Sequence, residues 1–414
     1  MSAIERILGD YDTAPPAADT AARQRAAGQL RSWGLPGHRE ENWRYANLKA
    51  FDAVASFQPV PVASSPSYTL PAALPGFARL VFINGRLQQA ASDAAAMALL
   101  RDAAVEAPLP PDRDQRHGLL AELFTTETAT LTVRGENAVE ALFISAAATP
   151  GTAQYPRFDL QLAPNARLTL IERHLGTGTG AAALVCAHSS VRIGAGARLV
   201  HYRLQQSDPA TAFMQSLSAR LDRDAEYRLR GIVAGSASAR SSSHVQLAGR
   251  GAALQWHELA VGSREQVHDG WLKVEHAAAQ TRNEQVFRGI ATDRARVAFA
   301  GHVHIAPEAS GADSDQSLRG LVDGGGAEID LKPQLQIDTD AVRAVHGATS
   351  GQLDENLLFY LLARGLDRDT ARALLKWAFL GDVLRTIEVP ELRHIAEQAA
   401  AGGLHDVLAA RALS

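Results

Sequence analysis

The pattern of the sequence changes at Val345-His346-Gly347-Ala348-Thr349-Ser350-Gly351. Upstream of this stretch, apolar residues alternate with polar ones, which is typical of half-buried strands: Leu331, Leu335 and Ile337. Downstream, Asp354 is suited to cap a helix, because its carboxylate can accept the unpaired backbone N–H groups of the first turn. Gly365 suits the left-handed position that ends such a helix. The sequence therefore predicts a β-rich body that gives way to a helical tail, with His346 at the junction.

A short motif recurs through the β-rich body. It consists of a turn-forming residue, an alanine, a charged or small residue and an apolar residue, and its copies are Asn165–Leu168, Gly196–Leu199, Asp224–Tyr227, Gly251–Leu254, Arg294–Val297 and Gly326–Ile329. The copies are mostly about 30 residues apart, with one gap of roughly 43, which is a spacing typical of stacked repeats. A strand–turn–strand unit cannot bury its apolar face alone, so neighbouring units must stack. We predict a β-solenoid, and a β-sandwich with coincidental turn residues is the alternative.

Three regions follow from these patterns. Residues 1–127 form an N-terminal helical or mixed region, 128–345 the solenoid core, and 346–414 a C-terminal helical domain. In the first region Asn84-Gly85 predicts a β-hairpin, because this pair supplies the two positive-φ positions of a type I′ turn. The predicted helices cover residues 21–35, 94–107, 117–124, 355–364, 368–387, 390–401 and 404–413.

Composition excludes several classes of protein. The 414 residues carry a net charge of −4 without a basic run, so nucleic acid is not an expected partner. The single cysteine, Cys186, rules out an internal disulfide and favours a reducing compartment. We find neither a signal-like N-terminus nor a stretch of about 18 apolar residues, so no membrane association is expected. These features predict a cytoplasmic protein.

The order of motifs around His346 resembles the C-terminal signature of the SufB/SufD family of iron–sulfur cluster assembly proteins. The matching elements are His346-Gly347-Ala348-Thr349, Leu353-Asp354, Phe359-Tyr360-Leu361, Arg364-Gly365, Leu374-Leu375 and Ala378-Phe379, with weaker support from Glu41-Asn42-Trp43-Arg44-Tyr45. The resemblance implies a right-handed parallel β-helix between helical ends. It further implies a non-catalytic scaffold subunit that pairs with a SufB-like paralogue and binds a SufC-like ABC ATPase. An exposed solenoid edge also allows a homodimer of the isolated chain.

The candidate site residue is His346. A neutral imidazole binds iron and replaces a thiolate in some clusters, whereas one cysteine cannot hold a conventional cluster alone. The resemblance therefore implies no cofactor held stably by this chain and a transient iron–sulfur cluster shared across an interface, with His346 as a metal ligand. The alternative is a purely structural histidine. Ala344 stands where relatives often carry a cysteine, which places the chain with the family's D members. Cys186 lies in an apolar segment, typical of a core residue.

The helical tail has two candidate roles, which are to cap the solenoid and to dock the ATPase. The residues that the resemblance assigns to docking are Phe359, Tyr360, Arg364, Leu375 and Phe379. For Phe359 and Tyr360, packing against the end of the solenoid is the favoured interpretation.

Two weaker motifs and one rival function remain. His302-Val303-His304 places two imidazoles on one face of a strand, where Asp338 or Asp340 could add a third metal ligand. The glycine pattern at 176–181 precedes a predicted strand and lacks the helix that a dinucleotide site needs. The rival function is a β-helix carbohydrate enzyme that uses Asp330, Asp338 and Asp340 as paired acids. Such an enzyme usually needs an aromatic-lined cleft, and only 6% of the residues are aromatic.

Overall fold

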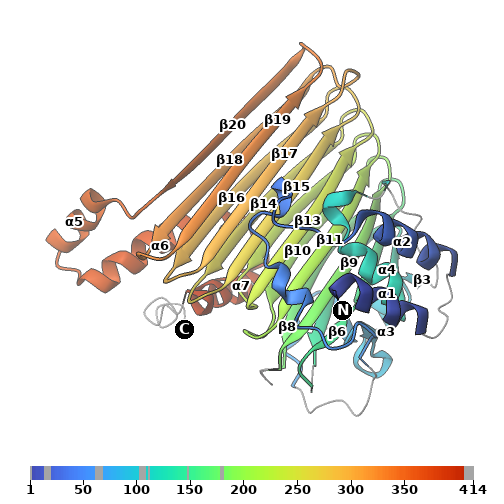
Figure 1. Cartoon of the computed structure of the whole chain (residues 1–414). Coiled ribbons are helices and arrows are strands. Elements are labelled where there is room, and N and C mark those ends of the chain that lie inside the picture. Colours follow the sequence, from blue (N-terminus) through green and yellow to red (C-terminus); the bar gives the residue numbers. More distant parts are fainter. Residues whose placement is uncertain are drawn as a thin grey trace.

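The computed structural model describes residues 2–13, 20–60, 69–101, 109–110, 112–146, 149–177 and 181–404. Its body is a stack of two β-sheets that the chain visits alternately, flanked by helices at both ends of the sequence (Figure 1). The predicted β-solenoid is confirmed, and the β-sandwich alternative is excluded by the parallel pairing of successive coils.

One sheet, called sheet B, has the strand order β2-β1-β5-β8-β10-β12-β14-β16-β18-β20. Its strands are β1 (Ala78–Ile83), β2 (Arg86–Leu87), β5 (Glu136–Ser145), β8 (Arg167–Gly176), β10 (Arg198–Gln206), β12 (Glu226–Val233), β14 (Ala253–Gly262), β16 (Arg282–Thr292), β18 (Ala312–Asp323) and β20 (Val342–Gly351). Apart from the β1–β2 hairpin, these strands pair in parallel.

The other sheet, called sheet A, has the order β19-β17-β15-β13-β11-β9-β7-β4-β3. Its strands are β3 (Leu100–Arg101), β4 (Thr128–Val133), β6 (Thr152–Gln154), β7 (Arg157–Leu162), β9 (Ala183–Ile193), β11 (Ala212–Leu221), β13 (Ser238–Leu247), β15 (Val267–His276), β17 (Arg296–Ile305) and β19 (Glu328–Ile337), with β6 paired to β9 beside the main path. Both sheets end in the last coil, at β19 and β20.

The recurring motif marks the turns into these strands. Asn165, Gly196, Asp224 and Gly251 all have positive φ angles, between 56° and 77°, and each precedes a strand of sheet B. The alanine that follows each of them is buried. The larger gap in the repeat has a simple cause: the copy at Gly251 leads into β14 of sheet B, whereas the copy at Arg294 leads into β17 of sheet A.

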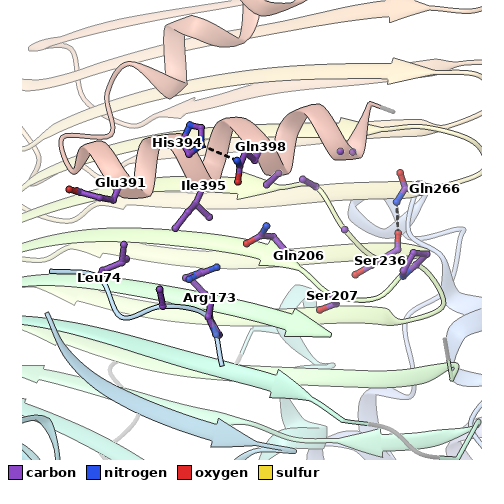
Figure 2. A pocket seen from close by; sticks show the side chains of 18 of the residues that line it. Leu74, Arg173, Gln206, Ser207, Ser236, Gln266, Glu391, His394, Ile395 and Gln398 are labelled. Atoms are coloured by element: carbon purple, nitrogen blue, oxygen red, sulfur yellow. Dashed lines mark hydrogen bonds between the residues drawn. The ribbon is translucent and has the colours of Figure 1, made fainter. Parts of the chain in front are cut away.

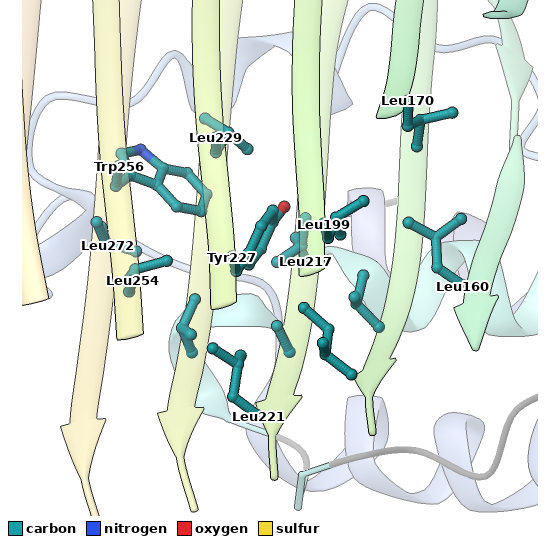
Figure 3. Close-up of a cluster of buried hydrophobic side chains, with 14 of the residues drawn as sticks. Leu160, Leu170, Leu199, Leu217, Leu221, Tyr227, Leu229, Leu254, Trp256 and Leu272 are labelled. Carbon is teal, nitrogen blue, oxygen red and sulfur yellow. The ribbon is translucent and has the colours of Figure 1, made fainter. Parts of the chain in front are cut away.

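The core lies between the sheets (Figure 3). Leu168, Leu199, Tyr227 and Leu254 are aligned in register on four neighbouring strands. Because every coil places its apolar residues at the same level, their side chains stack along the axis and exclude water. All four residues are buried.

Helices cover parts of both sheets. The helical elements are α1 (Ala3–Thr13), α2 (Thr20–Trp33), η1 (Glu41–Trp43), η2 (Leu48–Phe51), η3 (Gln89–Ala91), α3 (Ala94–Met97), η4 (Arg113–Gln115), α4 (Gly118–Phe124), α5 (Glu355–Ala363), α6 (Arg368–Leu384) and α7 (Pro390–Gly403). Helices α1, α2 and α4 share a hydrophobic cluster with β9 and β11, whereas α6 and α7 pack on β12, β14 and β16. Within the described residues, none of the helices has the length and apolarity needed to cross a membrane.

Several local predictions are confirmed and others corrected. Asn84 and Gly85 have positive φ in the β1–β2 turn, as the hairpin requires, although β1 belongs to sheet B and extends the solenoid before residue 128. The helix predicted over 94–107 is too long, since α3 ends at Met97 and Leu100 pairs with β4. Its part at 102–107 lies outside the described residues. The helix predicted over 404–413 falls almost entirely outside the described residues.

The N-terminal motif around Trp43 has a structural role. Trp43 is fully buried, and the Arg240 guanidinium lies 4.4 Å from the centroid of its ring. Glu41 forms an ion pair with Lys332 of β19. The motif therefore fastens the N-terminal region to sheet A.

Candidate functional site at the open end of the solenoid

The last coil leaves two strand edges uncovered. Strand β19 ends sheet A and β20 ends sheet B, and neither has a further neighbour among the described residues (Figure 1). Unpaired edges present free N–H and C=O groups to another chain. The edge of β19 carries Lys332 and Pro333, residue types that discourage pairing. The edge of β20 lacks proline, and Val345 on it is 48% exposed. Strand β20 is therefore the more open edge.

His346 lies in the middle of this outermost strand. The prediction that it marks the strand-to-helix junction is corrected, because β20 continues to Gly351. His346 is exposed and is aligned in register with Gln316 of β18. Among the described residues, no group of three or more His, Cys, Asp and Glu side chains could hold a metal ion. A metal at His346 would thus need ligands from a second chain.

A buried pair of amides lies one coil inside His346. Gln316 Nε2 donates to Gln285 Oε1 at 3.0 Å and to the Gly301 carbonyl at 3.2 Å. Both glutamines are buried, and Gln316 Oε1 has no hydrogen-bond partner among the described residues. A Cβ at Gly301 would lie 2.7 Å from both amides, so glycine is needed there. At its open end, the interior of the solenoid therefore contains a hydrogen-bond acceptor without a partner among the described residues, Gln316 Oε1, on the strand next to that of His346.

Cys186 is confirmed as a core residue. It is fully buried in β9 within the cluster that includes Leu184 and Met214. Burial raises the pKa of its thiol, because a thiolate is poorly solvated there. Cys186 is thus neither accessible nor ionised for metal binding. The structure places it on β9, far along the stack from β20.

The metal site predicted at His302 and His304 is only partly formed. His304 Nε2 lies 2.8 Å from Asp338 Oδ2, as adjacent strands β17 and β19 allow. No third ligand completes the group within the described chain. Asp330 neighbours Glu328 instead, and burial together with that carboxylate raises the pKa of Asp330. Asp330, Asp338 and Asp340, the acids proposed for sugar chemistry, do not line the large cavity under α7.

The helical tail exposes apolar side chains near the open end. Leu357, Phe359 and Tyr360 of α5 and Leu374 of α6 are 47–71% exposed, and we call them the α5–α6 patch. The favoured interpretation that Phe359 and Tyr360 pack against the solenoid is therefore wrong. Arg364 lies over the Tyr360 ring, 5.0 Å from its centroid.

The remaining docking candidates behave differently. Leu375 and Phe379 are partly buried against the hydrophobic cluster that contains Leu380 and Val383. They secure α6 to the face of sheet B over β14 and β16, so the tail does not cover the edges of β19 and β20. The docking role of the tail stays a prediction. The predicted cap at Asp354 is confirmed, since Asp354 accepts from the Asn356 N–H at 2.8 Å. Asp367 caps α6 in the same way and accepts from the Thr370 N–H at 2.9 Å.

Uncovered strand edges at the last coil and an exposed apolar patch on the helical tail are features typical of proteins that associate with other chains. Residues 143–379 match the model of the family described as "SUF system FeS cluster assembly, SufBD core domain". The chain therefore belongs to this family. It is 29% identical over 377 residues to the iron–sulfur cluster assembly protein SufD of Escherichia coli (strain K12), covering 87% of each chain. It is 26% identical over 405 residues to a SufBD family protein of Synechocystis sp., covering 90% of this chain and 88% of that one.

A plant relative is also similar. The chloroplastic protein ABCI7 of Arabidopsis thaliana is 30% identical over 207 residues, which cover 50% of this chain and 44% of that protein. Membership of the SufB/SufD family, which the sequence motifs indicated, is confirmed, and the chain has a role in iron–sulfur cluster assembly.

Proposed function

We propose that this chain is a non-catalytic scaffold subunit of a cytoplasmic iron–sulfur cluster assembly complex. It pairs through β20 with a SufB-like paralogue and binds a SufC-like ATPase through the α5–α6 patch. One observation carries the proposal. The large hydrophobic side chains exposed in the described part of the chain all fall between residues 337 and 374: Ile337, Val345, Leu357, Phe359, Tyr360 and Leu374. Exposed apolar residues concentrated in this way mark interaction surfaces.

In this proposal His346 supplies one ligand to a cluster that forms only across the β20 interface. Its exposure suits a ligand shared with a second chain, and a metal-binding imidazole usually donates its other N–H to an acceptor. The unused Gln316 Oε1 on the neighbouring strand is a candidate for that acceptor.

The two surfaces are joined by a short segment. Residues 352–354 separate the end of β20 from the start of α5, and Leu353 within them is buried. A displacement of α5 by a bound ATPase would therefore be transmitted directly to the strand that carries His346. We expect ATP-driven movement of the ATPase subunits to change the geometry of the β20 interface.

Co-purification with the paralogue and the ATPase tests this assignment. Val345→Lys places a charge on the open edge and is expected to remove the paralogue while the ATPase stays bound. Phe359→Ser is expected to do the reverse. Thr169→Lys, a partly exposed position on β8 in the middle of sheet B, is the matched control and is expected to retain both. Retention of both partners by Val345→Lys and Phe359→Ser would contradict the proposal.

A further inference from the structure

A large cavity lies under α7, away from the open end of the solenoid. Its volume is about 1270 Å³, and its walls are α7, residues 71–75 and the loops that follow β10, β12 and β14 (Figure 2). No residue of β20 or α5 lines it. The size is sufficient for a cofactor-sized molecule, because typical ligand cavities measure about 300–1,000 Å³.

Helix α7 has two distinct faces, which explains why the cavity stays open. Leu392, Ala396 and Ala400 are buried against sheet B. The face toward the cavity carries His394 and Gln398, which are hydrogen bonded to each other at 2.9 Å. Toward the C-terminal end of the helix, only the small residues Ala399, Gly402 and Gly403 line the cavity. Gly402 is exposed at the rim of the cavity, and a Cβ added there would meet no atom within 4 Å.

The cavity wall contains a buried positive charge without a full partner. Arg79 and Arg173 share the single carboxylate of Glu140, and all three residues are buried. Arg79 is held closely, with its Nε 2.8 Å from Glu140 Oε2 and its Nη atoms donating to the carbonyls of residues 71 and 72. Arg173 Nη1 lies 3.4 Å from Glu140 Oε1. Its Nε has no hydrogen-bond partner among the described residues.

The buried group of Arg79, Arg173 and Glu140 therefore carries one net positive charge. Two carboxylates also line the cavity: Glu265, which is paired with Arg294, and Glu391 on α7. A buried charge is costly unless it is paired and hydrogen bonded, and here burial lowers the pKa of Arg173. Arg173 lines the cavity and still has donors to offer. Nearby, Gln206 Oε1 is also buried without a hydrogen-bond partner in the described structure. Leu74 and Ile395 supply apolar wall on either side (Figure 2).

We propose that this cavity binds a small amphipathic molecule with one anionic group, a carboxylate or a phosphate, for which Arg173 is the counter-ion. The apolar part of the molecule contacts Leu74 and Ile395. The site is independent of the proposed scaffold role, since its walls and the partner surfaces share no residue.

The test is a fluorescence titration of the full chain with 8-anilinonaphthalene-1-sulfonate, which has an aromatic body and one anionic group. N-phenyl-1-naphthylamine, the same body without the sulfonate, is the neutral probe. Arg173→Met removes the charge and leaves Glu140 paired with Arg79. Gly402→Leu adds a bulky side chain at the rim of the cavity, and leucine is favoured over glycine within a helix. Gly28→Leu on α2, also without an atom within 4 Å of the added Cβ, is the matched control.

We expect one saturable site for the sulfonate probe, weakened at least tenfold by Arg173→Met and by Gly402→Leu and unchanged by Gly28→Leu. Arg173→Met is expected to leave binding of the neutral probe unchanged. Competition with octanoate and with inorganic phosphate then distinguishes the two anionic groups, and at least one should displace the probe. Absence of a saturable site, displacement by neither anion, or equal binding by wild type and both variants would overturn the proposal. Thermal melting of each variant excludes unfolding as the cause of a loss.

Discussion

Phe359→Ser is expected to weaken ATPase binding by about a hundredfold without changing the stability of the isolated chain. Phe359 is 71% exposed. An aromatic side chain buries roughly 150–250 Å² when fully covered, so docking would cover about 110–180 Å² more of it. At about 25 cal/mol per Å², this is about 3 to 4 kcal/mol, and 1.4 kcal/mol corresponds to a tenfold change in Kd. Binding costs absorb part of that energy, so tenfold is the smallest effect we expect.

Calorimetric titration of the purified ATPase into the chain measures this effect, with urea unfolding of the same samples. Phe359→Ser should change the free energy of unfolding by no more than about 0.5 kcal/mol, as is usual for exposed sites. Phe379→Ser is the informative contrast, because Phe379 is partly buried against sheet B and its loss should cost about 2 kcal/mol or more of stability. An unchanged Kd for Phe359→Ser would refute the assignment of the α5–α6 patch.

Two further predictions concern stability. Burial lowers the pKa values of His117 and His188 from 6.5 to about 3, so both are neutral when folded, whereas the unfolded chain takes up protons below about pH 6.5. The stability that the two neutral histidines contribute is therefore complete above pH 6.5 and is lost as the pH falls toward 3. Between pH 6.5 and 5 the free energy of unfolding falls by about 2 kcal/mol per histidine. His188→Asn should reduce this pH slope in urea unfolding, and an unchanged slope would show that His188 is not held neutral in the folded chain. Gly301→Ala should lower the free energy of unfolding by about 1 to 3 kcal/mol, because its Cβ would collide with Gln285 and Gln316; a melting temperature equal to wild type would contradict the tight contact.

The solenoid was predictable because its repeat is local. A turn residue with positive φ followed by a buried alanine occurs at the entry to β8, β10, β12 and β14, and both preferences are visible in the sequence. The position of His346 was harder to predict. Strand β20 has no covering coil, so its residues need not alternate in polarity, and the sequence shows no clear end of the strand at Gly351. The alanine-rich run after Ala94 has high helix propensity, yet the pairing of Leu100 with β4 ends the helix early.

Exposure and cavities depend on distant residues, which single-sequence patterns do not report. Phe359 and Phe379 both lie in apolar helical segments, and only the packed structure shows that the first is exposed and the second partly covered. The cavity at Arg173 brings together residues from positions 47 to 403, and the charge of its buried arginine depends on Glu140 being shared with Arg79. A pattern of local motifs gives no signal for such a site.

Cluster assembly by the reconstituted complex of this chain, the SufB-like paralogue and the ATPase tests the central claim most directly. Iron, sulfide and ATP would be supplied, and the charge-transfer absorbance of the cluster would be followed over time. We expect His346→Ala to form the complex and melt like the wild type, because His346 is exposed, while cluster formation falls at least tenfold. His304→Ala, on β17 one strand in from the edge of sheet A, is the control and should assemble normally. Cluster formation by His346→Ala at the wild-type rate would contradict the ligand role and, with it, the shared site at β20.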